Sequence, residues 1–131
     1  MVCLETDFLI AVMRKDEKAM QKLKEMVDRG ENLATTPINA SELFKGVYLF
    51  ENINENLKKV RGILGRMDLL SFNLVACDIY GRTYSQLRTT GEPTGEFDTL
   101  IASIALSHNE RVVTRNTQHF SRVEGLEIEE W

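Results

Sequence analysis

The sequence predicts an α/β fold in which helices cover both faces of a mostly parallel sheet. Short apolar segments with the length of strands alternate along the chain with longer segments whose apolar residues recur at helical spacing. Strands separated by helices pair in parallel through right-handed crossovers. The 131 residues contain no linker, internal repeat or low-complexity tract, so we expect one domain, residues 1–131.

Five short segments are expected to be strands. The first is an apolar run that ends in the turn-prone sequence Glu-Thr-Asp before a new apolar run begins. The last alternates apolar and polar residues, which is typical of an edge strand. The expected strands cover 2–4, 33–36, 68–72, 111–114 and 126–129.

Helices are expected between these strands. Residues 17–29 carry one apolar stripe and are followed by Gly30, a frequent residue just beyond a helix. Thr36 and Pro37 predict the start of the next helix, because proline lacks only an N–H that the first turn does not use. Further helices are expected at 8–13, 53–67, 74–88 and 95–109, the last with Thr94 as its cap, and loops at 50–56 and 89–95.

Composition limits the classes of function. No apolar run approaches the ~20 residues of a membrane span, and no secretory signal is visible, so we expect a cytoplasmic protein without membrane contact. Cys3 and Cys77 lack metal-ligand spacing and are interpreted as reduced thiols used in packing. The net charge of −4 argues against a protein that binds nucleic acid through a broadly positive surface.

Acidic residues are expected to meet at one edge of the sheet. Glu5 follows the first strand, Glu42 lies early in the helix after the second strand, and Asp98 lies near the start of a late helix. Open α/β sheets bind ligands at the carboxyl ends of their strands, where the polar segment 114–120 is also expected. Close carboxylates repel one another, so a hard divalent cation such as Mg²⁺ or Mn²⁺ fits this site. Zinc would require the His and Cys clusters that this chain lacks.

Each of these features also has a purely structural interpretation. An arbitrary Glu-Thr-Asp turn is more often a surface turn with two solvated acids. Asp98 shares a helix face with apolar Ile101 and Ala102, yet the N-terminus of a helix by itself favours an acid in the first turn. His119 is either a plain loop histidine or a contact to an RNA phosphate, and His108 is interpreted as a partner of a helix C-terminus.

At these residues the sequence resembles the PIN-domain nucleases, and among them the VapC-type toxins of prokaryotic toxin–antitoxin pairs. Four blocks carry the resemblance, in the family's order and spacing, and together they cover nearly the whole chain. They are Leu-Glu-Thr-Asp-Phe-Leu-Ile at 4–10, Ala-Ser-Glu-Leu-Phe-Lys-Gly at 40–46, Gly-Glu-Phe-Asp-Thr-Leu-Ile-Ala at 95–102 and Val-Thr-Arg-Asn-Thr-Gln-His-Phe at 113–120.

The resemblance implies a PIN-like three-layer α/β/α sandwich around a five-stranded, mostly parallel sheet. It also implies an endoribonuclease that depends on one or two Mg²⁺ or Mn²⁺ ions and hydrolyses phosphodiester bonds of single-stranded or structured RNA. Such a protein acts as the toxin of a pair, forms a homodimer and is inhibited by a cognate VapB-type antitoxin.

By position, the resemblance also assigns roles to residues of this chain. Glu5 and Asp98 would hold the principal ion, Glu42 would ligate it or position the attacking water, and Asn116 would hold a water bound to the ion. These four residues form the expected catalytic site. Thr6, Glu96 and Thr114 would support it. Apart from the resemblance, the basic residues Arg115 and Lys45 are hypothesised RNA phosphate contacts. Lys58, Lys59 and Arg61 are weaker candidates, for which a solvated helix face is the favoured interpretation.

Two residues depart from the family's pattern. Glu5 stands where the family has Asp and is one methylene longer, which disturbs a magnesium site or favours manganese, because Mg²⁺ requires near-ideal octahedral geometry. His119 stands where many members have a further acid. The first departure leaves a second function open, a PIN-like scaffold of low activity that binds RNA or a partner protein.

A two-component receiver domain fits poorly, because Arg115 stands where that module has Lys.

Overall fold

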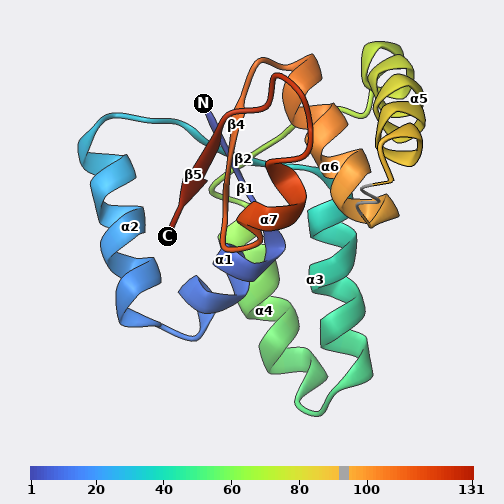
Figure 1. Cartoon of the computed structure of the whole chain (residues 1–131). Helices are drawn as coiled ribbons and strands as arrows, with labels where there is room; N and C mark the ends of the chain where they lie inside the picture. The colour runs from blue at the N-terminus through green and yellow to red at the C-terminus, as the bar shows by residue number, and fades with distance from the viewer. Residues whose placement is uncertain (92–94) are drawn as a thin grey trace.

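The computed structural model describes residues 1–91 and 95–131, and it contains a five-stranded parallel sheet between two layers of helices (Figure 1). The strand order is β3-β2-β1-β4-β5, so β1 is the central strand and β5 lies at an edge, as predicted. All neighbouring strands pair in parallel. The strands are β1 (Val2–Leu4), β2 (Leu33–Thr35), β3 (Asp68–Leu69), β4 (Arg111–Thr114) and β5 (Ile128–Glu130).

Each face of the sheet is covered by its own group of helices. Val2 and Leu4 of β1 belong to a core with residues of the first four helices, whereas Cys3 belongs to a second core with residues of the last three. Figure 1 shows α5 and α6 together on the side of the molecule away from α2. The helices are α1 (Thr6–Met13), α2 (Glu17–Asp28), α3 (Pro37–Leu49), α4 (Ile53–Leu64), α5 (Leu74–Thr89), α6 (Glu96–Ser107) and α7 (Thr117–Phe120).

Side-chain caps start four of these helices, α1, α2, α3 and α5. Asp16 accepts a hydrogen bond from the N–H of Ala19 at the start of α2, and Asn73 caps α5 in the same way. Thr36 caps α3 directly before Pro37, as predicted. The predicted cap of α6, Thr94, lies outside the described residues, and Gly95 is the residue that precedes this helix.

Several predicted bounds were wrong. Helix α1 begins two residues earlier than expected, because the side chain of Glu5 itself caps it. Strand β3 has two residues instead of five, and both are exposed. Helix α4 begins at Ile53, as predicted, after Asn52 in a left-handed conformation with φ 61°, but it ends at Leu64 instead of residue 67.

The two cysteines have different environments. Cys3 is fully buried in the core, as predicted, and its burial raises the pKa of its thiol. Cys77 is exposed on α5, so the prediction that it serves packing was wrong. Both thiols are free.

An ion-pair network attaches the C-terminal strand to the rest of the molecule. Glu129 of β5 binds Lys22 of α2 at 2.7 Å, Arg111 of β4 at 2.8 Å and Arg29 at 3.1 Å. Arg111 also binds Glu31. Because Glu129 and Arg111 are both partly buried, this network fixes the edge strand beside the strand that leads into the predicted site.

Candidate active site

Glu5 lies at the carboxyl end of the central strand, where it ends β1 and starts α1. Its backbone N–H donates to the carbonyl of Val113 at 3.1 Å, and its carboxylate accepts from the N–H of Asp7 at 3.2 Å. The residue is only 7% exposed. Burial, together with the neighbouring carboxylates of Asp7 and Asp98, raises its pKa to about 9. Glu5 therefore takes up a proton at neutral pH unless a cation compensates its charge.

Glu42 is joined to the same edge by a chain of hydrogen bonds. The hydroxyl of Thr6 donates to Glu42 Oε1 at 2.8 Å and accepts from Asn39 Nδ2 at 2.8 Å. Asn39 in turn accepts from the hydroxyl of Thr36 at 2.7 Å, and both of these residues are fully buried. The predicted supporting role of Thr6 thus has a geometric basis, since it orients one oxygen of Glu42.

Asp98 is surrounded by polar groups from the segment that follows β4. The Asn116 amide donates to Asp98 Oδ2 at 3.0 Å, and His119 Nδ1 lies 3.2 Å from the same oxygen. Thr114 accepts a hydrogen bond from the N–H of Asn116 at 2.9 Å, which shapes the turn between β4 and α7. The structure therefore brings three of the predicted residues together and adds His119, whose side chain is 42% exposed.

The described structure also uses two residues that sequence reasoning did not assign to the site. Asp7 Oδ2 accepts from the backbone N–H of Arg115 at 3.0 Å, and Oδ1 is buried without a partner among the described residues. Asn39 connects Thr6 to the start of α3. The sequence held signals for both, because Asp7 belongs to the first acidic turn and Asn39 stands three residues after the Thr36 cap.

The remaining predicted residues lie at the margins of the candidate site. Glu96 is exposed and accepts from the Tyr80 hydroxyl at 3.3 Å. Lys45 is exposed on α3. The guanidinium of Arg115 lies 3.7 Å from the centre of the Trp131 ring. Lys58, Lys59 and Arg61 are exposed on α4.

The acidic residues Glu5, Glu42 and Asp98 lie at the carboxyl edge of the sheet, but they do not form a complete set of metal ligands. Within residues 1–91 and 95–131, no group of three or more His, Cys, Asp or Glu residues is arranged to hold a metal ion. Two observations nevertheless fit a hard divalent cation. First, the side chains of Glu5, Asp98 and Asn116 offer oxygen atoms as metal ligands, which Mg²⁺ and Mn²⁺ prefer. Second, the buried carboxyl of Glu5 has no salt bridge in the described part of the chain.

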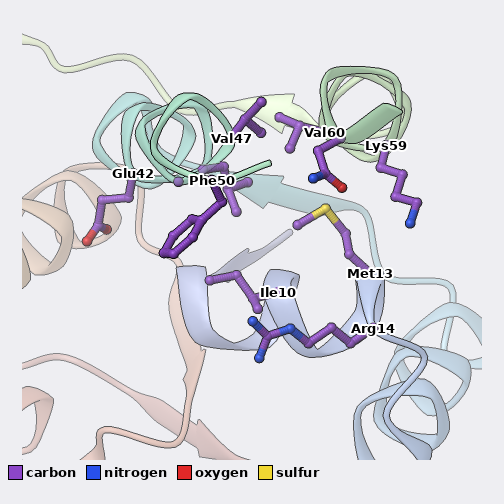
Figure 2. Close-up of a pocket in the computed structure, with 11 residues that line it drawn as sticks. Ile10, Met13, Arg14, Glu42, Val47, Phe50, Lys59 and Val60 are labelled. Carbon is purple, nitrogen blue, oxygen red and sulfur yellow. The ribbon is translucent and has the colours of Figure 1, made fainter. Parts of the chain in front are cut away.

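A groove of about 300 Å³ adjoins Glu42, between α1, α3 and α4 (Figure 2). Figure 2 shows Glu42 at one end and Lys59 at the other, Phe50 and Ile10 facing each other across the apolar middle, and the guanidinium of Arg14 below Ile10. The groove is thus mainly apolar and carries opposite charges at its two ends. An extended or helical peptide segment fits such a shape.

Comparison with known proteins identifies the family. A sequence model described as the PIN domain matches residues 2–126. The chain belongs to the PIN-domain family. Within that family it is of the VapC type: it is 30% identical over 128 residues to the tRNA(fMet)-specific endonuclease VapC of Shigella flexneri, covering 98% of this chain and 96% of that protein. It is 27% identical over the same length to ribonuclease VapC1 of Haemophilus influenzae strain R2866, with the same coverage.

Solved structures of VapBC complexes confirm the predicted PIN-like fold. The structure of VapBC2 from Rickettsia felis bound to a promoter DNA fragment contains a chain with a TM-score of 0.92 and 26% identity, and the match covers 100% of this chain and 99% of that one. The DNA-bound VapBC of Salmonella typhimurium gives a TM-score of 0.89 at 28% identity, with the same coverage. In the part of this PIN-domain protein that the structure describes, every helix is too short or too polar to cross a membrane.

Proposed function

We propose that this VapC-type protein is a metal-dependent endoribonuclease that hydrolyses RNA phosphodiester bonds as the toxin of a toxin–antitoxin pair in the cytoplasm. The observation that carries the proposal is the buried carboxyl of Glu5, which lies near Asp98 at the carboxyl edge of β1 and β4. Its relatives named ribonuclease VapC and tRNA(fMet)-specific endonuclease support RNA as the substrate.

Glu5 and Asp98 would hold the principal Mg²⁺ or Mn²⁺ ion, and a second ion would share these ligands or Glu42. Such an ion lowers the pKa of an attacking water and neutralises charge on the phosphodiester. Asn116 fixes the orientation of Asp98 through its amide. Glu42, which is bound through one oxygen to Thr6, leaves its other oxygen to accept a proton from the attacking water.

The partner that we propose is a VapB-type antitoxin, because the solved relatives are VapBC complexes. The groove between α1, α3 and α4 supports this proposal. Its apolar middle fits the hydrophobic side chains of a peptide, Arg14 and Lys59 fit acidic side chains, and Glu42 fits a basic one. A peptide seated there would cover Glu42 and so block the site.

The experiment that tests the nuclease is cleavage of a fluorophore-quenched single-stranded RNA by purified protein free of antitoxin, with Mg²⁺, Mn²⁺ or EDTA. We expect cleavage that requires metal and is lost in Asp98→Asn. The matched control is Asp78→Asn, which removes an exposed carboxylate on α5 and should cleave as the wild type does. Normal cleavage by folded Asp98→Asn protein would refute the assigned site.

A catalytically weak scaffold that binds RNA or a partner protein is the second candidate. The observation that favours it is the open arrangement of the acids in the described residues, together with glutamate in place of aspartate at position 5. If the folded protein does not cleave RNA, the Glu5→Asp variant tests this candidate. Cleavage gained by Glu5→Asp would show that the longer side chain is what lowers activity.

A further inference from the structure

Arg115 is fixed in the structure at both its backbone and its side chain. It lies between Thr114 and Asn116 in the turn after β4, and its backbone N–H donates to Asp7 Oδ2 at 3.0 Å. Its guanidinium lies 3.7 Å from the centre of the Trp131 ring, a distance typical of a cation–π contact. The backbone of Arg115 is therefore bound to the acidic turn that follows β1, and its guanidinium is held against the Trp131 ring before any substrate arrives.

Trp131 owes its position to packing. It is 8% exposed and belongs to the core on the α1 side of the sheet. Its ring meets the fully buried ring of Phe8 edge to face, with centroids 5.2 Å apart and an interplanar angle of 76°. The indole N–H is buried and has no hydrogen-bond partner among the described residues. Contacts to Phe8 and Arg115 therefore orient the ring, and Figure 1 shows the chain ending beside α2 and α1.

The stacked arrangement leaves Arg115 able to bind an anion. A cation–π contact uses the face of the guanidinium, whereas its N–H donors point outward in the plane of the group. Its ion pair with Asp16 is 3.9 Å long, and the two side chains are 52% and 41% exposed. An exposed pair of this length contributes little to stability, so a phosphate can take the place of Asp16.

We propose that Arg115 binds an RNA phosphate beside the acidic edge and that Trp131 is its positioning residue. The inference rests on the proposed nuclease function. A phosphate fits the planar donors of a guanidinium better than a single ammonium group, and preorganisation by the indole lowers the entropy lost on binding. In a protein of net charge −4, such a fixed cation also offsets local repulsion of the RNA.

The test compares four variants of the active protein: Arg115→Ala, Trp131→Leu, Trp131→Phe and their control Arg82→Ala on exposed α5. We expect Arg115→Ala and Trp131→Leu to raise KM for the quenched RNA about tenfold with little change in kcat, which corresponds to the loss of one charge-assisted hydrogen bond. Trp131→Phe, which keeps an aromatic face, and Arg82→Ala should stay within about twofold of the wild type.

A second measurement separates phosphate binding from stabilisation of the fold. In an Asp98→Asn background, RNA binding is followed by fluorescence anisotropy at several salt concentrations. Arg115→Ala and Trp131→Leu should each reduce the slope of log K against log salt by about 0.7, the value for one phosphate contact on a single strand. The double variant should bind no more weakly than Arg115→Ala alone, because both changes remove the same contact.

Three outcomes would overturn the inference. Unchanged KM and salt slope in Arg115→Ala would show that this residue does not bind phosphate. A lower melting temperature with unchanged KM in Trp131→Leu would show that the stack only stabilises the fold. If Trp131→Leu does not fold, Trp131→Phe is the variant that tests the role of Trp131. A KM for Trp131→Phe that is raised as far as the KM of Arg115→Ala refutes the role of the aromatic face. Failure of the wild type to cleave or bind RNA would instead remove the proposed function, and the inference with it.

Discussion

Glu5 is one methylene longer than the aspartate of the family pattern, and the structure accommodates it as the N-terminal cap of α1. Its pKa of about 9 lies above its ordinary value of 4.5, so the folded protein binds a proton there that the unfolded chain has released. In the metal-free protein, stability contributed by neutral Glu5 is therefore lost as the pH rises from about 4.5 to about 9.

This effect is measurable by urea unfolding in EDTA between pH 5 and pH 9. The free energy of unfolding of the wild type should fall more steeply with rising pH than that of Glu5→Gln, which has no such proton to lose. Mn²⁺ should reduce the difference, since a bound cation stabilises the ionised carboxylate. Parallel pH profiles for the two proteins would contradict the assigned pKa.

Asn39 links the start of α3 to Thr6, which is 33 positions away in sequence, and hence to Glu42. It is fully buried, so Asn39→Ala should leave the Thr36 hydroxyl without its acceptor and the Thr6 oxygen without its donor, and destabilise the fold by about 1–3 kcal/mol. Thermal or urea unfolding measures this loss. Ser41→Ala on the same helix, which removes an exposed hydroxyl bonded to Pro37, is the control and should change stability little.

At the scale of elements, strand β5 depends on Glu129. Although its burial alone would raise the pKa, hydrogen bonds from Lys22, Arg111 and Arg29 lower it to about 2. The folded-state pKa is thus below the ordinary value of 4.5, and the stability that this carboxylate contributes is present above pH 4.5 and lost as the pH falls towards 2.

The variant Glu129→Gln should therefore be less stable than the wild type by about 1–3 kcal/mol at pH 7. The difference should shrink as the pH falls below 4.5 and be largely lost at about pH 2, where the wild-type carboxylate becomes protonated as well. Unfolding curves recorded at pH 7 and at about pH 2 test this. A difference that persists unchanged at low pH would show that the network does not hold β5 through charge.

Local signals explain which elements were predictable from the sequence. Strand β4 was predicted at its actual bounds, and the start of α3 was predicted from Thr36 and Pro37, because these features depend on neighbouring residues. The carboxyl edge shared by Glu5, Glu42 and Asp98 followed from the parallel topology. The contacts of Asn39 with Thr6 and of Trp131 with Arg115 were not predictable, because side chains 33 and 16 positions apart meet only through the packing of whole elements.

At the scale of the whole molecule, the homodimer stays a prediction, and α5 offers a surface for it. Leu74 and Val75 are 85% and 58% exposed, an unusual exposure for neighbouring apolar residues. We expect Leu74→Glu to convert a dimer into a monomer in light scattering. Leu49→Glu, which alters an exposed leucine at the end of α3, is the matched control and should remain dimeric. The reverse result would place the interface at α3.

Metal binding tests the account of the acidic edge most directly, independently of which RNA is cut. Titration of Mn²⁺, followed by calorimetry or by electron paramagnetic resonance, should show one or two ions bound by the wild type and by Asp78→Asn. Binding should be lost or strongly weakened in Asp98→Asn and Glu5→Gln. Equal Mn²⁺ binding by the wild type and these two variants would contradict a metal site built on Glu5 and Asp98.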